Sequence, residues 1–229
     1  MANSTTVYGG SGCGTACILS MVDTGSVESR RYYLARRTLM EMLRDRGYVV
    51  ANMETELCHS LADFGEVFGD KPETERLRVI ACRASDPSRK IVAIFCETFE
   101  IIRKRYIVGI VSQIVNKGTL DRVILILQSK INFHAQKVLD EYPVKVETFP
   151  ISDLLVNTTK HLQATKHEIL TPEEKEKLMK KHSIEDKQLP RMLESDAIAK
   201  YYGLEKAQVV KVTYSSDLTG LIVTFGCVM

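Results

Sequence analysis

Apolar positions recur every three to four residues over residues 26–46 and then follow the shorter period of β-strands. The first stretch predicts a helix, and Gly47 supplies a left-handed stop at its end. A shorter helix is predicted over residues 57–68. The β-branched runs 78–83 and 91–96 flank a Ser-Asp-Pro-Ser turn and predict a hairpin.

Helix and strand patterns then alternate. We predict a helix over residues 103–116, a strand over 122–127, a helix over 132–141 and a last strand over 144–149. The strand at 122–127 is apolar throughout, which is typical of a strand covered on both faces. The series indicates a mixed α/β domain of three layers around a central sheet.

The last seventy residues follow a polar joint at residues 157–161 and have their own start and stop signals. Thr171-Pro-Glu-Glu is a capping box that begins a helix, and Lys180-Lys-His182 ends it where cations suit the helix dipole. A short helix over residues 195–202 and two strands over 208–214 and 221–225 follow.

We therefore predict a two-domain α+β and α/β protein. The segments are a flexible tail at 1–25, an N-terminal domain at 26–156 and a small C-terminal α+β module at 157–229. The tail contains Gly9-Gly-Ser-Gly-Cys-Gly-Thr15, which resembles a phosphate-binding loop but has no lysine before the threonine. A glycine-rich tail is the better interpretation.

Charge is nearly balanced, with 31 basic and 29 acidic residues and a net charge of +2. The surplus lies before residue 161, and the remainder has ten residues of each sign. The first helix has six arginines against three acids, a pattern that fits a solvated face or a local contact with nucleic acid. These arginines are Arg30, Arg31, Arg36, Arg37, Arg44 and Arg46.

The composition also argues against several other classes of protein. The apolar runs are too short to cross a bilayer, so no membrane partner is predicted. The six cysteines contain no C-x-x-C pair and indicate thiols in a reducing compartment. A zinc site from Cys13, Cys17 and distant histidines is disfavoured by this spacing, so no metal and no cofactor are predicted.

Catalytic patterns in the sequence are incomplete. There is no G-x-S-x-G elbow, and neighbouring Cys58 and His59 do not share a helix face. A metal-dependent nuclease would need an acid such as Asp86 with a Glu and Lys pair on the next strand. Glu97 is present but residue 99 is Phe, so the nuclease stays a weak alternative.

The sequence from His167 onward is more specific. It reads His167-Glu-Ile-Leu-Thr-Pro-Glu-Glu-Lys, Gln188-Leu-Pro-Arg191, Asp196-Ala-Ile-Ala-Lys-Tyr-Tyr-Gly-Leu204 and Gln208-Val-Val-Lys-Val212. These residues resemble the C-terminal module of the fifth subunit of nuclear RNA polymerases, a module that archaeal polymerases also contain. The segments 31–48 and 149–157 resemble the jaw domain of the same family.

The resemblance implies a nuclear, non-catalytic polymerase subunit whose C-terminal module docks on the largest subunit. It also implies that the N-terminal domain forms part of the lower jaw beside downstream DNA. The docking residues carried over are Gln188, Leu189, Pro190, Arg191, Asp196, Tyr201, Tyr202, Gly203, Val209, Val210 and Lys211. The candidate DNA-facing residues are Arg30, Arg31, Arg36, Arg37, Asn132 and His134.

The chain also departs from the family pattern. Tyr214 and the run Gly220-Leu-Ile-Val-Thr-Phe-Gly226 stand where the family has arginines, and Ala207 replaces a habitual glycine. Residues 132–135 replace the family's Thr-Pro-Ser-Ala turn near DNA. We interpret these departures as those of a diverged paralogue whose partner presents fewer acidic groups.

The glycine-rich tail and Tyr32-Tyr-Leu-Ala-Arg-Arg37 are similar to the plant form used by RNA polymerase V, whose transcripts guide DNA methylation and gene silencing. One alternative is the subunit shared by polymerases I, II and III. An alternative of another class is a free-standing DNA-binding module, which would bind DNA alone with a steep dependence on salt.

Overall fold

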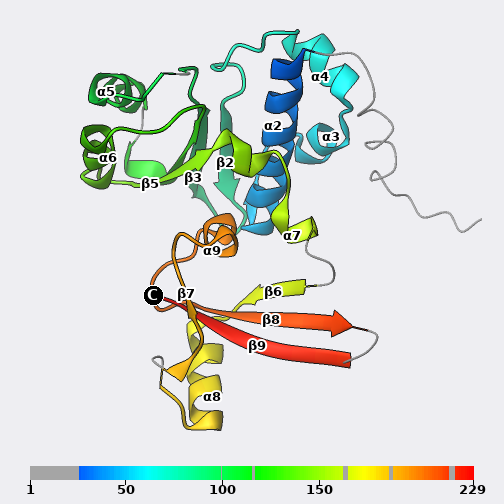
Figure 1. The fold of residues 1–229 in the computed structure, drawn as a ribbon, viewed down its shortest axis with the longest axis vertical. Coiled ribbons are helices and arrows are strands. Elements are labelled where there is room, and N and C mark those ends of the chain that lie inside the picture. The colour runs from blue at the N-terminus through cyan, green and yellow to red at the C-terminus, as the bar shows by residue number, and fades with distance from the viewer. Residues whose placement is uncertain (1–25, 99, 115–116, 162–164, 186–187, 217–219) are drawn as a thin grey trace, which may run out of the picture.

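The N-terminal part folds around a five-stranded mixed sheet (Figure 1). The computed structural model describes residues 26–229 apart from 99, 115–116, 162–164, 186–187 and 217–219, so the predicted tail lies outside the described residues. The strand order is β1 (Tyr48–Val49), β2 (Val79–Arg83), β3 (Asp86–Phe95), β4 (Leu120–Leu127) and β5 (Lys145–Pro150). β1 to β3 are antiparallel, whereas β3, β4 and β5 are parallel.

Helices cover both faces of this sheet (Figure 1). One face is covered by α2 (Val27–Asp45), α3 (Met53–Cys58) and α4 (Leu61–Phe68), the other by α5 (Lys104–Ser112) and α6 (Phe133–Asp140). Alternate residues of β4 pack to opposite sides, with Ile124 in the core under α2 and Leu125 in the core under α5 and α6. The predicted three-layer arrangement and the doubly covered strand are confirmed.

Element boundaries differ from the predicted ones for local reasons. The helix predicted over residues 57–68 is two helices, because Ser60 and Asp63 form a capping box that begins α4. The hairpin is confirmed, but β3 already begins at Asp86 inside the predicted turn. The helix predicted to end at residue 116 ends at Ser112, and residues 115–116 lie outside the described residues.

The C-terminal part has a four-stranded sheet in the order β6 (Thr165–Ile169), β8 (Val209–Ser216), β9 (Gly220–Val228) and β7 (Arg191–Met192). Sequence periodicity missed β6 and β7. At one end of this sheet, α8 (Pro172–His182) contributes Leu178 and Met179 to a core around Val209. The predicted capping box of α8 is confirmed. The helix α9 (Ala197–Tyr202) lies between the two sheets (Figure 1).

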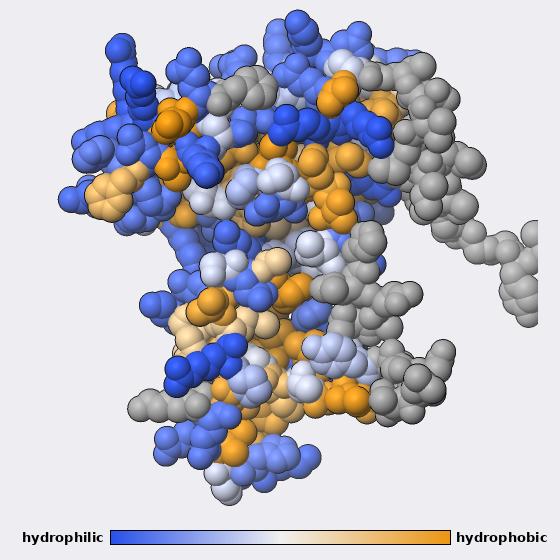
Figure 2. Space-filling model, in the orientation of Figure 1, coloured by the Kyte–Doolittle hydropathy of each residue, from blue (hydrophilic) through white to orange (hydrophobic). Residues whose placement is uncertain are grey.

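The two parts form two lobes with a narrower waist in the space-filling view (Figure 2). The chain crosses between them through η3 (Ile151–Leu154) and α7 (Thr158–His161). Ile151 and Leu154 are buried in the core under α2. The predicted fold class is confirmed, while the domain boundary at residue 156 stays a prediction. In the part of the chain that the structure describes, no helix has the length and apolarity to span a membrane.

Candidate interaction sites

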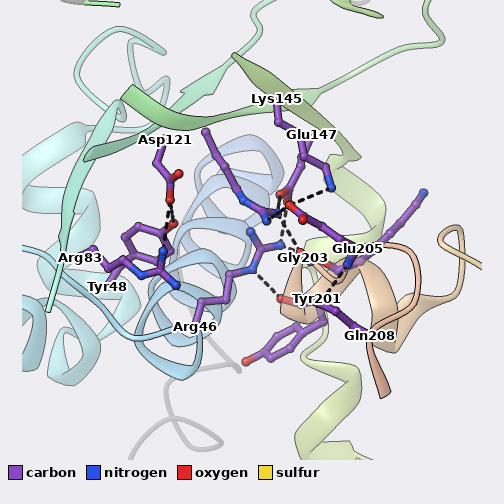
Figure 3. A network of polar contacts seen from close by, with 12 residues as sticks. Arg46, Tyr48, Arg83, Asp121, Lys145, Glu147, Tyr201, Gly203, Glu205 and Gln208 are labelled. Carbon is purple, nitrogen blue, oxygen red and sulfur yellow. Dashed lines mark hydrogen bonds and ion pairs between the residues drawn. The ribbon is translucent and has the colours of Figure 1, made fainter. Parts of the chain in front are cut away.

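Arg46 joins the two lobes (Figure 3). It is the C-cap of α2, and its side chain is only 4% exposed. Its Nε donates to the Tyr201 carbonyl at 2.8 Å and its Nη2 to the Lys200 carbonyl at 2.6 Å. Both carbonyls lie at the C-terminal end of α9, where the helix dipole is negative. The Lys200 carbonyl also accepts from Gly203 N at 3.0 Å. A cation from one lobe therefore caps a helix of the other.

Glu147 on β5 lies between two guanidinium groups. Its Oε2 is 2.8 Å from Arg46 Nη2, and its Oε1 is 2.6 Å from Arg122 Nη1 on the neighbouring strand β4. Burial acts to raise the pKa of this carboxyl, but the two arginines together hold the pKa below its ordinary value. The carboxylate is therefore charged and binds both arginines.

Gly203 allows this close approach. Arg122 Nη1 donates to the Gly203 carbonyl at 2.7 Å, and Arg122 Nη2 lies 2.6 Å from Glu205 Oε1. Gly203 has a φ of +62°, and a Cβ here would come within 2.9 Å of both Arg46 and Arg122. Glycine is needed for both the backbone conformation and the space. We call Arg46, Arg122, Glu147, Gly203 and Glu205 the inter-lobe junction.

A second group of polar contacts lies beside this junction. The Tyr201 hydroxyl donates to Asp45 Oδ2 at 2.6 Å and accepts from Asn157 Nδ2 at 3.2 Å. Asn157 Nδ2 also donates to Glu41 Oε2, and Lys160 Nζ lies 2.6 Å from Glu41 Oε1. Burial, helped by the Asp45 hydrogen bond, raises the pKa of Tyr201. The phenol therefore stays protonated and acts as a donor.

The structure separates the predicted docking residues into two sets. Leu189, Val209 and Val210 are buried in the C-terminal core, and Tyr201 and Gly203 belong to the contacts between the lobes. These five residues stabilise the chain's own fold, which corrects the expectation that they face a partner. The remaining candidates are exposed or half-buried: Gln188, Pro190, Arg191, Asp196, Tyr202 and Lys211.

Two of the remaining candidates have structural contacts as well. The Asp196 side chain caps α9 by accepting from the Ile198 backbone N–H at 2.9 Å. Lys211 Nζ is 2.9 Å from Glu168 Oε2 on the adjacent strand. Arg191 is exposed on β7, and its neighbour Pro190 accepts a hydrogen bond from Cys227 N. Docking through these exposed residues stays a prediction.

Arg36 is wrongly placed among the DNA-facing candidates. It is 8% exposed, forms a two-bond pair with Glu56 at 2.9 and 2.8 Å, and donates to the Leu77 carbonyl. Hydrophobic neighbours and a fixed carboxylate bury this arginine on the side of α2 that faces the fold. Arg37 is half-buried and also pairs with an acid, since its Nε lies 3.8 Å from Glu41.

The other candidates lie on α2 and α6 and are exposed or half-buried. Arg30 is exposed and Arg31 half-buried on α2. Asn132 and His134 are exposed at the start of α6, where the Asn132 side chain caps the helix by accepting from His134 N.

A cleft of about 560 Å³ brings Arg31 together with two lysines that sequence reasoning missed. Lys130 comes from the loop after β4, and Lys200 comes from α9 of the other lobe. Among the described residues that line the cleft there is no carboxylate, while Ser129 and Ser152 supply hydroxyls. Because its cations come from three distant segments, no local sequence motif could have revealed this basic cleft.

The residues considered for nuclease chemistry do not meet. Asp86 begins β3 and Glu97 follows its end, so about 30 Å of extended strand separates them. Asp86 instead accepts hydrogen bonds from the Ser88 side chain and backbone, which hold its pKa below the ordinary value. Within the described ranges, no three potential metal-ligating side chains cluster.

Two models of one family match the two lobes. The model for the RNA polymerase Rpb5 N-terminal domain matches residues 26–113, and that for the Rpb5 C-terminal domain matches residues 156–228. Together they cover more than half of the chain. The chain therefore belongs to the RNA polymerase Rpb5 family and is an RNA polymerase subunit, as the resemblance in its sequence indicates.

Relatives with curated names make the relationship more specific. DNA-directed RNA polymerase V subunit 5C of Arabidopsis thaliana is 53% identical over 216 residues, which are 94% of this chain and 91% of that protein. Subunit 5A of polymerase V from the same plant is 46% identical, covering 93% of this chain and 94% of that protein. A subunit of polymerases I, II and III from Caenorhabditis briggsae is 30% identical, covering 89% and 98%.

Proposed function

We propose that this chain is a non-catalytic subunit of a nuclear RNA polymerase V that acts in RNA-directed DNA methylation and gene silencing. The observation that carries the proposal is the difference in identity between two groups of relatives. Identity is 53% and 46% to two proteins named as polymerase V subunits, and 30% to a protein named as shared by polymerases I, II and III. All three alignments cover 89% or more of this chain.

The inter-lobe junction supports a role in which the C-terminal lobe docks on another subunit and thereby positions the N-terminal lobe. Arg46 and Arg122 bind the same carboxylate of the N-terminal lobe and the carbonyl end of α9 in the C-terminal lobe. These contacts are buried and charge-assisted, so they resist rotation of one lobe against the other. A largest subunit that holds the C-terminal lobe, as we propose, also sets the position of the N-terminal lobe.

The basic cleft of Arg31, Lys130 and Lys200 is the surface that we propose faces downstream duplex DNA. Three cations without a carboxylate in the lining favour a phosphate backbone. The net charge of the whole chain is only +2, so the isolated chain is expected to bind DNA weakly. DNA contact would thus depend on the other polymerase subunits holding the duplex nearby.

Native purification tests the polymerase assignment. The full-length tagged chain is isolated from nuclei of cells that express it, and its partners are identified by mass spectrometry. We expect a complete set of polymerase subunits that includes the largest subunit of polymerase V. Recovery with the largest subunit of polymerase I, II or III alone would support the shared-subunit alternative, and recovery as a lone chain would contradict both.

Salt dependence tests the basic cleft and the free-standing DNA-binding alternative together. The double variant Lys130→Glu with Lys200→Glu should lower the affinity of the assembled polymerase for downstream duplex DNA. The slope of the logarithm of affinity against the logarithm of salt concentration should become shallower by about 1–2. The matched control is Lys177→Glu on the exposed face of α8. Tight, strongly salt-dependent DNA binding by the isolated chain would favour the free-standing module instead.

A further inference from the structure

The β9 strand has an open edge over most of its length. β8 pairs with it from Gly220 to Cys227 without a register shift, while on its other side β7 pairs only with Cys227 and Val228. Among the residues that the structure describes, no strand covers the outer edge from Gly220 to Gly226. Gly220 to Thr224 are exposed and Gly226 is buried, so about 15 Å of strand edge is available there.

The side chains of Leu221, Ile222 and Val223 on this edge are apolar and exposed. From Gly220 to the C-terminus the sequence has no charged side chain and no proline. Leu221 is 70% exposed, and its neighbours Ile222 and Val223 are 44% and 39% exposed. Figure 2 shows apolar surface on the lower lobe, where Figure 1 places the hairpin of β8 and β9. Natural sheet edges normally carry charges, bulges or proline that prevent pairing with other chains.

The opposite edge of the same sheet has that protection. β6 carries Lys166, whose side chain is 72% exposed, and Lys166 pairs with Glu168 at 2.6 Å. Glu168 also pairs with Lys211 on β8, and hydrogen bonds from both lysines lower the pKa of this carboxyl to about 2. One edge of the sheet is therefore charged and the other is uncharged. The edge of β9 therefore lacks the protection that the edge of β6 has.

We propose that the open edge of β9 accepts an extended, uncharged segment of another polymerase subunit as an added strand. The inference rests on the proposed function, because it requires the chain to work inside a polymerase. Backbone hydrogen bonds would supply the pairing, and the alternating apolar side chains would select an uncharged segment. The five exposed edge residues, Gly220 to Thr224, fall short of the roughly 20–30 residues a side of a stable interface. This size disfavours a second copy held by the edge alone and favours a larger partner that also contacts the C-terminal lobe elsewhere.

The test introduces charge on the edge of the full-length tagged chain. Leu221→Lys with Val223→Lys places two lysines on one face of β9, where an added uncharged segment would bury them. We expect about tenfold less co-purified polymerase than with the wild type. Val67→Lys with Val108→Lys is the matched control, because both valines are exposed on helices of the N-terminal lobe and should leave recovery unchanged. Circular dichroism and the thermal midpoint check that each variant folds.

Photo-cross-linking gives a second readout that needs no destabilising charge. A benzophenone side chain at Ile222 in the assembled polymerase should cross-link to one uncharged segment of another polymerase subunit. Cross-linking to a second copy of this chain, or to no polymerase subunit, overturns the inference. Normal polymerase recovery by the lysine variant overturns it while the proposed function stands. Failure of the wild-type chain to recover any polymerase would overturn both this inference and the proposed function.

Discussion

Replacing Arg46 by Met should separate the behaviour of the two lobes. The change removes the cation that pairs with Glu147 at 2.8 Å and takes away the side-chain donor of the Tyr201 and Lys200 carbonyls. The Lys200 carbonyl keeps its hydrogen bond from Gly203 N. Loss of one partner of a buried ion pair costs about 3–5 kcal/mol. Because Arg122 still pairs with Glu147, we expect the lower end, about 3 kcal/mol of unfolding free energy.

Urea unfolding is the assay. The chain contains no tryptophan, so circular dichroism and tyrosine fluorescence report the transition. With a urea slope of about 2–3 kcal/mol/M, the midpoint should fall by about 1–1.5 M. We also expect the single transition of the wild type to split into two, because the lobes lose their shared contacts. Arg30→Met on the same helix is the matched control and should change stability by less than about 0.5 kcal/mol, since Arg30 is exposed.

A double-mutant cycle then distinguishes the ion pair from the helix cap. Combining Arg46→Met with Glu147→Gln should cost clearly less than the sum of the single changes, because the two side chains share one interaction. A midpoint for Arg46→Met within the range of the Arg30→Met control would refute the idea that the junction couples the lobes. Strict additivity in the cycle would show that the Arg46–Glu147 pair contributes little.

Three further predictions concern single positions. Gly203→Ala should destabilise the chain by about 1–2 kcal/mol more than Gly47→Ala. Both glycines have a positive φ, but only a Cβ at residue 203 would contact other atoms. Chemical unfolding of the two variants measures the difference. Burial lowers the pKa of His167, so the folded state favours the neutral imidazole, and stability is lost as the pH falls below about 6.5. Thermal midpoints between pH 7.5 and 5.5 should therefore drop more for the wild type than for His167→Gln. Arg36→Ala should lower the unfolding free energy by about 2–3 kcal/mol and with it the thermal midpoint, because Arg36 pairs with Glu56 inside the fold. The DNA affinity of the assembled polymerase should not change.

Much of the N-terminal fold follows from sequence because its signals are local and agree with one another. The apolar run of β4 indicated a doubly covered strand, and Gly47 indicated the end of α2. The strands β6 and β7 lacked such signals. β7 has two residues and exists only through its pairing with β9, and Ile169 is the single apolar residue of β6.

The interaction sites were harder to predict because long-range packing decides them. Arg36 and Arg46 belong to one arginine-rich helix, and periodicity could not show that both point into buried ion pairs. Arg122 and Glu147 lie in strands that also carry Asp121 and Lys145, so no isolated charge marked them as a buried pair. The basic cleft had no local signal either, because Lys200 reaches it only through the packing of α9 between the lobes.

A reconstruction of the polymerase purified through this chain, at a resolution that shows side chains, tests the central claim most directly. We expect the C-terminal lobe to contact the largest subunit of polymerase V and the inter-lobe junction to be intact. We also expect the cleft of Arg31, Lys130 and Lys200 to face downstream DNA. An added strand should lie along β9. A polymerase in which the N-terminal lobe makes the main subunit contact, or in which the cleft faces away from the duplex, would contradict this central claim.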